Sequence, residues 1–324
     1  MAVGIGYRSF FGLGEESTYG TSVARSHYVE INSESLAVTE PTIKTNSLFR
    51  RGYKNILVAQ GGVSVAGDIE FDAMYGGWLK LAKHAFGRID TSVPDPTSNA
   101  TVKRHKFTIV NTLPTGLTLE VFRDTTDLVT EPSKSYLYTG CKLNSMRFAG
   151  AVDEILKVTC GVIGRQEGRV AKSSESFAAE KLAVYHQGKL DWGSDELAVE
   201  EFEIALENGL DLRPRFNSRF TREPIPNSKV AVNGSFTTEF DSWAQYDDFR
   251  NATERRLLVT FTGDVITGSY SKYIELDCKI GRIVAARCVL NSPGRVMMEI
   301  DFEAYRDETN NELILTAQNT EQGL

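Results

Sequence analysis

Apolar and polar residues alternate over much of the chain. In residues 63–72 the odd positions are mostly apolar, whereas the even positions include Asp68, Glu70 and Asp72. Residues 156–162, 230–241, 274–280 and 296–302 alternate in the same way. Because successive side chains of a strand point to opposite faces, this pattern predicts half-buried antiparallel strands. The fold class that we expect is mainly β (α+β).

Two segments have helical rather than strand periodicity. Residues 73–86 place apolar side chains, among them Trp78, at helical spacing, although two adjacent glycines weaken the first turn. Residues 242–253 begin with a residue suited to cap a helix and carry Trp243 at similar spacing. Aromatic residues in such a pattern usually face a core. We therefore expect one helix in each segment, with both tryptophans buried.

The two halves of the chain share four sequence landmarks in the same order. A Val-x-Val-x-Gly stretch begins at Val63 and again at Val230, and Glu-Phe-Asp follows each. The pair Cys-Lys precedes an aliphatic residue at Cys141 and at Cys278, and Val-Glu-Ile at 29–31 matches Phe-Glu-Ile at 202–204. Repeats of this kind are typical of duplicated structural units. We therefore expect two tandem units, an arrangement that suits symmetric assembly better than catalysis.

The composition of the intervening segments indicates where the units begin and end. The first unit spans residues 1–165 and contains a surface insertion, rich in Pro, Thr, Ser and Asn, at about 89–113. Residues 166–176 are polar, lack periodicity and are the predicted linker. The second unit spans residues 177–315, and residues 316–324 are expected to be flexible.

Each unit contains a long basic segment before its acidic strand. The first arm (residues 32–62) and the second arm (residues 207–229) are long enough to be either functional or disordered. Their basic residues are Lys44, Arg50, Arg51 and Lys54 in the first arm, and Arg213, Arg215, Arg219 and Arg222 in the second. The arms are either solvated loops or docking elements for acidic surface on a neighbouring subunit. One acidic candidate is 191–211, with eight carboxylates and no Lys or Arg.

Composition narrows the class of protein. The hydrophobic content of 41% and charged content of 24% are typical of a globular chain, and 324 residues suffice for two domains. A net charge of −7 argues against general nucleic-acid binding. The four cysteines form no CxxC pair, so we expect free thiols and no zinc. No signal peptide or apolar membrane span is visible, and we expect synthesis in a cytoplasm and no membrane partner.

The sequence contains no pattern of residues typical of a catalytic site. The four histidines are not spaced as metal ligands or as partners of a nucleophile, and phosphate-binding fingerprints are absent apart from a weak glycine pattern at 11–15. Asp68, Glu70 and Asp72 could bind calcium or act as a glycosidase pair, but they also fit a solvated strand face. We expect no enzyme activity, no cofactor and no metal.

Three stretches resemble the tail tube (major tail) proteins of long-tailed bacteriophages. They are residues 14–21, which match Glu-x-x-x-Tyr-Gly-Thr, the strand at 61–72 with its helix, and residues 138–164. The resemblance implies antiparallel β-sandwich or half-barrel units, each with one flanking helix. Six such units close a ring around an inner β-barrel, and stacked rings form the tube for DNA ejection. Two units per chain imply a trimeric ring, with a hexamer as the alternative if the second unit decorates the outside.

The resemblance also implies roles for particular residues. Candidates to line an acidic lumen, where they would repel DNA phosphates, are Asp68, Glu70, Asp72, Glu239 and Asp241; the same face could instead meet outer solvent. The basic residues of the two arms are candidates for docking between rings. Implied partners are further copies of the chain, the tape measure, tail tip and terminator proteins, and double-stranded DNA in transit. The implied location is the virion tail, assembled in the host bacterial cytoplasm.

Two other functions fit the residues less well. One is the tube component of a tailocin or secretion-like machine, which shares the architecture without DNA. The other is a β-sandwich tail module that binds carbohydrate or a host surface. Such a module needs exposed aromatic residues on loops, and Trp192 is the single tryptophan expected to be free for that role.

Overall fold

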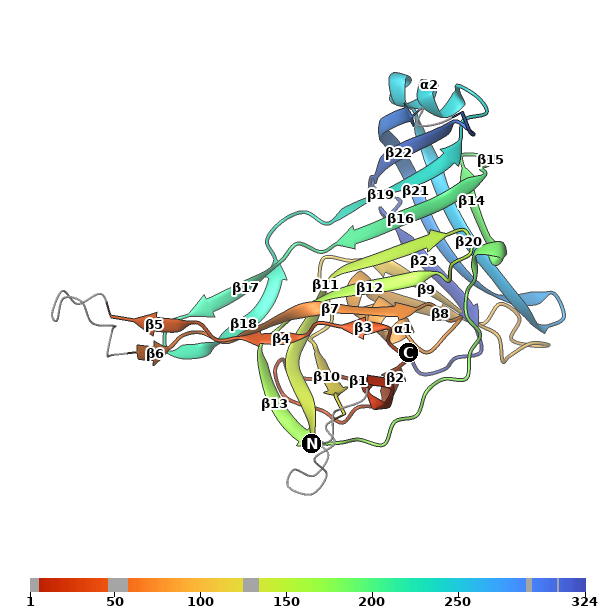
Figure 1. The fold of residues 1–324 in the computed structure, drawn as a ribbon. Coiled ribbons are helices and arrows are strands. Elements are labelled where there is room, and N and C mark those ends of the chain that lie inside the picture. Colours follow the sequence, from red (N-terminus) through yellow and green to blue (C-terminus); the bar gives the residue numbers. More distant parts are fainter. Residues whose placement is uncertain (1–5, 46–57, 125–133, 290–292, 308) are drawn as a thin grey trace.

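The computed structural model describes residues 6–45, 58–124, 134–289, 293–307 and 309–324. It is mainly β, with antiparallel sheets and two short α-helices, as the alternation of apolar and polar residues predicts (Figure 1). Most strands join one hydrogen-bonded network, and two hairpins stand apart from it as separate two-stranded sheets.

A central sheet of seven strands crosses from the first half of the chain to the second. In spatial order the strands are β7 (Ser64–Asp72), β12 (Lys157–Gly164), β11 (Lys134–Ala151), β16 (Val199–Glu207), β19 (Ala231–Glu239), β22 (Met297–Ala304) and β21 (Tyr270–Val289). The joint between the halves is β11–β16, which pairs Ser145 with Glu207 at one end and Ala151 with Glu201 at the other. One face of the sheet is buried, through residues such as Phe148.

The two longest strands, β11 and β21, each belong to two layers. The first part of β11 pairs with β10 (Leu117–Phe122) and β13 (Gln166–Ala171), and its second part pairs with β12 and β16. The first part of β21 pairs with β20 (Glu254–Thr267) and β23 (Ile314–Asn319), and its second part pairs with β22. Both strands shift register near the change of partner, at 143–145 and at 283–285. Such bulges bend a strand from one layer into another.

Shorter strands complete the layers. They are β1 (Phe10–Glu15) and β2 (His27–Val29) beside β10, β14 (Gly188–Trp192) and β15 (Asp195–Glu196) beside β20, β8 (Gly87–Ser92) and β9 (Lys103–Ile109) beside β23, and β3 (Ser33–Glu34) and β4 (Ala37–Thr39) beside β7. The β8–β9 hairpin overlaps the segment expected to be an insertion, and β13 occupies the start of the expected linker. Because β23 is buried to its last residue, a loose C-terminal end begins no earlier than Thr320.

The two helices differ in length and burial from the sequence expectation. Helix α1 (Leu79–Phe86) begins six residues later than expected, after Gly77, whose φ of +86° is unsuited to a helix. Trp78 is buried as predicted and packs against the rings of Phe71 and Phe148. Helix α2 (Ala244–Asn251) is close to its expected bounds. Two 3₁₀ turns, η1 (Gly6–Arg8) and η2 (Tyr185–Gln187), complete the helical content of the described residues.

The two basic arms contain hairpins that lie side by side. The first arm forms β5 (Thr42–Lys44) and β6 (Val58–Gln60), and the second forms β17 (Leu210–Arg215) and β18 (Ser218–Pro226). Figure 1 shows both hairpins extending from the same side of the molecule. The backbone N–H of Val63 donates to the carbonyl of Arg219 at 2.7 Å, which ties the base of the first arm to the tip end of the second arm. Segments about 160 residues apart in sequence therefore form one projection.

Candidate functional site

The face of the central sheet opposite the buried face is dominated by carboxylates. Residues paired across antiparallel strands share a face, so the register assigns these side chains to one surface. Its acidic members are Asp68, Glu70, Asp72, Glu201, Glu203, Glu207, Glu239, Glu299, Asp301 and Glu303. Its basic members are Lys142, Arg147, Lys157, Arg282 and Arg287, of which Lys142 is buried and lies 2.6 Å from Glu223. We call this surface the acidic face; it extends across strands from both halves of the chain.

Several basic side chains of the acidic face are already paired with carboxylates. A guanidinium nitrogen of Arg147 lies 3.3 Å from Glu203, and one of Arg287 lies 3.4 Å from Asp301. Lys157 lies 2.8 Å from Glu154 at the end of the sheet. These contacts neutralise positive charge locally, so the unpaired carboxylates determine the sign of the surface. Loss of solvent raises the pKa of Glu207, which sits beside the base of the second arm.

The five residues predicted to line a lumen fall near this surface. Asp68, Glu70 and Asp72 lie on β7, and Glu239 is the last residue of β19. Asp72 accepts a hydrogen bond from the Asn32 side chain at 2.7 Å, and Glu239 pairs with Arg295. Asp241 lies beyond the end of β19 and is exposed before α2. The structure therefore places four of the five on one sheet face.

The predicted docking residues are distributed between the two hairpins. Lys44 is exposed on β5, whereas Arg50, Arg51 and Lys54 lie outside the described residues. Arg213, Arg215, Arg219 and Arg222 lie on β17 and β18.

Arg219 makes contacts with the first arm that leave it less available for another subunit. Its Nε donates to the carbonyl of Gly61 at 3.0 Å, and a terminal nitrogen lies 3.3 Å from a carboxylate oxygen of Glu40. Its observed contacts join the two arms within one chain. Arg215 and Arg222, by contrast, are exposed on the hairpin surface.

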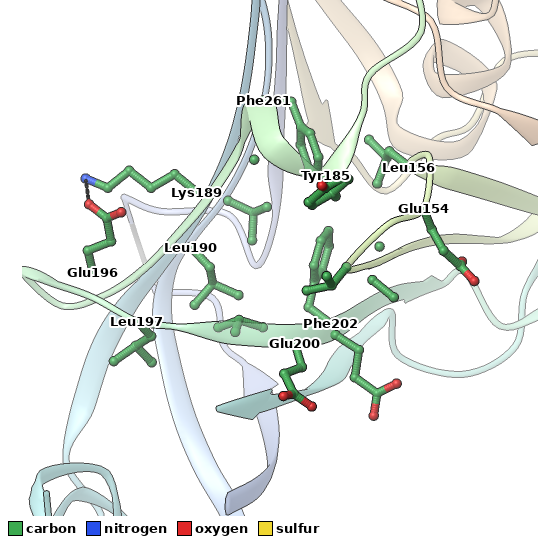
Figure 2. A pocket seen from close by; sticks show the side chains of 17 residues that line it. Glu154, Leu156, Tyr185, Lys189, Leu190, Glu196, Leu197, Glu200, Phe202 and Phe261 are labelled. Carbon is green, nitrogen blue, oxygen red and sulfur yellow. Dashed lines mark ion pairs between the residues drawn. The ribbon is translucent and has the colours of Figure 1, made fainter. Parts of the chain in front are cut away.

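An apolar pocket with an acidic rim lies at the start of β16, a feature that sequence reasoning missed. Its volume is about 130 Å³, and its apolar lining includes Leu156, Leu190, Phe202 and Phe261 (Figure 2). The carboxylates among its lining residues are Glu154, Glu196, Glu200 and Glu201, and the single lysine there is Lys189. These residues come from four separate parts of the chain. The signal in sequence is the acidic stretch 191–211, but the apolar floor depends on pairing between distant strands.

The N-terminal segment that carries the family resemblance is a structural junction with two carboxylates. Glu15 lies beside α1, with Oε1 2.8 Å from Nζ of Lys83 and 3.1 Å from Nε2 of His84. Hydrogen bonding with His84, reinforced by Lys83, holds the pKa of Glu15 well below its ordinary value in spite of partial burial. The motif therefore fastens strand β1 to helix α1.

Glu16 fastens the same segment to the β10–β11 layer. Its buried carboxylate accepts hydrogen bonds from the backbone N–H of Gly20 at 2.6 Å, from Gly140 at 2.9 Å and from the Thr118 hydroxyl at 2.9 Å. Burial raises the pKa of Glu16. Because the three donors come from a turn and from strands β10 and β11, the role of this residue is to hold the path of the chain.

A comparison with protein families decides the identity. A family model described as phage tail tube protein matches residues 6–304, which is most of the chain. The chain belongs to the phage tail tube protein family. It is a structural component of the virion tail rather than an enzyme, and its family implies self-assembly together with other tail proteins. A comparison with curated proteins finds no match.

Two expectations about tryptophans in the tail tube protein are wrong. Trp243, expected in the core, is 61% exposed, whereas Trp192, expected to be free for a ligand, is 2% exposed. The buried face of α2 instead carries Gln245 and Asp248. Because Trp192 is buried, it is not the exposed aromatic residue that a carbohydrate-binding module needs.

The expectation of free thiols in the tail tube protein is met. All four cysteines are free thiols, and Cys141 and Cys278 are fully buried. Burial raises the pKa of Cys278 and suppresses its thiolate. Within residues 6–45, 58–124, 134–289, 293–307 and 309–324, neither α-helix has the length and apolar character needed to cross a bilayer.

Proposed function

We propose that each tail tube protein carries two tube units and that three chains close one ring. The order of strand pairing supports this proposal. In the first half β7 pairs with β12 and β12 with β11, and in the second half β19 pairs with β22 and β22 with β21. A helix follows the first strand of each set, and the third strand bends between two layers. Each half therefore contains the same set of parts.

The β11–β16 pairing, which joins the two halves of one chain, indicates how neighbouring chains would pair. Strand β16 lies between β11 of the first half and β19 of the second half. Strands β3 and β4 lie beside β7 in the position that β16 has beside β19. In the described residues, β21 beyond Arg282 is paired with β22 on one side and with no strand on the other. We infer that this edge pairs with β3 and β4 of the next chain. Such pairing removes exposed sheet edges and closes the ring.

We further propose that the acidic face lines the lumen of the ring. The single observation that carries the proposal is the continuity of this carboxylate-rich face over strands from both halves. Carboxylates at Asp68, Glu70, Asp72 and Glu239 repel DNA phosphates. DNA then passes without the attractive contacts that make binding tight and dependent on salt.

The projecting arms are proposed to connect one ring to the next. Opposite charges on two surfaces guide encounter and fix register. The basic candidates on one ring are Lys44, Arg213, Arg215 and Arg222. The acidic partner on the adjacent ring is the part of the stretch 191–211 that precedes the lumenal residues of β16, where Asp195, Glu196 and Glu200 lie. The tape measure, tail tip and terminator proteins are proposed partners at the two ends of the stack.

The mass and symmetry of the ring test this function. The full chain is purified, its soluble mass is measured by light scattering, and any rings or tubes are imaged by electron microscopy. Rings of three chains with six similar subunit densities are the expected result. Rings of six chains, with one half of each chain on the outside, would reject the proposal of two wall-forming units.

A further inference from the structure

The tip of the second arm presents an unusually exposed aromatic ring. Phe216 is 100% exposed, and it is followed by Asn217, whose φ of +65° forms the tight turn between β17 and β18. Arg215 precedes the ring, and Arg213 lies one step further along β17. Ile43 of the first arm, which is 60% exposed, lines the same surface hollow as Phe216. An exposed patch of apolar side chains is typical of a contact surface.

The pocket at the start of β16 matches this tip in size and charge. Its volume of about 130 Å³ is close to the roughly 150 Å³ of a protein cavity that holds one benzene ring. Figure 2 shows Leu156, Phe202 and Phe261 around the space, with Glu154 and Glu200 directed outward. Lys189 is engaged with Asp191 at 3.0 Å and Glu196 at 3.2 Å. Two more rim carboxylates are also in ion pairs, Glu154 with Lys157 at 2.8 Å and Glu200 with Arg295 at 2.7 Å. Among the rim carboxylates, Glu201 lies outside these ion pairs.

The tip and the pocket lie at opposite ends of the same strand. Val199–Phe202 at the start of β16 line the pocket, and the second arm follows Glu207 at the end of β16. A strand of this length spans roughly 30 Å, and the hairpin extends away from it (Figure 1). The arm points away from the pocket of its own chain. A contact of this kind between copies is head-to-tail and continues from one molecule to the next.

We propose that Phe216 of one chain inserts into the β16 pocket of a chain in the adjacent ring. Arg215 and Arg213 face the rim carboxylates Glu201 and Glu200, the second of which Arg295 of the same chain also contacts at 2.7 Å. Apolar burial and charge pairing then act together. This inference rests on the proposed stacking of rings and names the residues that make the contact. It requires no contribution from Arg219, which is held by the first arm.

The first experiment compares Phe216→Ala with Ile225→Ala in the full-length protein. Ile225 is 47% exposed at the base of the same hairpin and is the matched control. We expect Phe216→Ala to keep the soluble ring mass of the wild type while raising the concentration needed for tubes about tenfold or more. Ile225→Ala forms tubes as the wild type does. Normal tube formation by Phe216→Ala would overturn the inference.

A cross-linking experiment tests the contact even where tubes are short. Phe216→Cys is combined with Val152→Cys at the pocket, in a Cys288→Ser background because Cys288 is the exposed native thiol. A mild oxidant should join the chains into a ladder of disulfide-linked oligomers. The pair Ile225→Cys and Val152→Cys should give none.

The outcomes separate the contact from the ring proposal. Wild-type tubes without a Phe216→Cys ladder would overturn the contact while leaving ring assembly intact. A ladder from a protein that forms no rings would support the contact and reject the ring. If the wild type forms no assembly and the variant with Phe216→Cys and Val152→Cys forms no ladder, both proposals fail.

Discussion

The indole Nε1–H of Trp192 donates a hydrogen bond to Oδ2 of Asp248 at 3.0 Å, inside the second half of the molecule. The same carboxylate is 3.0 Å from a terminal nitrogen of Arg255. Helix α2 therefore turns a charged residue inward. The rings of Trp243, just before the helix, and of Tyr246 and Phe249 within it make edge-to-face and tilted contacts along a partly exposed face. One buried carboxylate reverses the orientation that helical periodicity predicts.

Removing this carboxylate should destabilise the fold. Asp248→Ala leaves the Trp192 N–H and the Arg255 guanidinium without their partner, at a cost of about 2–4 kcal/mol in the free energy of unfolding. The measurement is urea denaturation of the soluble form. Asp247→Ala, one residue away and exposed, is the control and should change stability little. Equal effects of the two substitutions would contradict the assigned role.

Glu15 should make stability depend on acid pH. Its pKa is lowered in the fold by His84 and Lys83, from an ordinary value of 4.5. The ionised form is therefore favoured in the native state, and the contribution is complete above about pH 4.5 and is lost as pH falls below it. Glu15→Gln should flatten the fall in melting temperature between pH 5 and pH 3 (about the window set by that shift). Glu30→Gln, at an exposed site, is the control.

Two glycines with similar backbone angles should respond differently to alanine. Gly140 has φ +64°, and a Cβ there would lie 2.8 Å from Cβ of Arg165 and 2.9 Å from Cζ of Tyr19. Gly268 has φ +55° and no neighbour within 4 Å. Gly268→Ala should cost about 1–2 kcal/mol for the left-handed backbone alone. Gly140→Ala should cost more, because it adds a clash; thermal denaturation that ranks them in the reverse order would refute this.

Charge reversal on the acidic face should convert a non-binding tube into a DNA-binding one. Asp68→Lys, Glu70→Lys and Asp72→Lys together replace repulsion by attraction, so tubes should co-sediment with double-stranded DNA. The binding should weaken steeply as salt rises. The neutral variant Asp68→Asn, Glu70→Gln, Asp72→Asn should lie between. Glu175→Lys, on the segment between β13 and η2 and outside this face, is the control. DNA binding by that variant alone would contradict a lumenal position for the acidic face.

Local features of the fold could be predicted from sequence, and non-local ones could not. Strands and their faces follow from alternation, because the side-chain period of a strand is a local property. The partnership of the two arms depends on contacts such as Arg219 with Gly61, which are far apart in the chain. The pocket at β16 likewise requires Phe202 and Phe261 to meet across different strand pairs. The burial of Trp192 was hidden because its partner, Asp248, reads as a solvent-facing residue of a helix.

The joint between β11 and β16 has a consequence for how a tail is built. Because both strands belong to one polypeptide, this joint forms during folding and carries no loss of translational and rotational freedom between molecules. In a ring of six units from three chains, half of the joints between units would lie within single chains. These joints form before any two molecules meet, because covalent linkage gives the two halves a high effective concentration. In the proposed ring, one defective polypeptide would remove two neighbouring units from the wall at once.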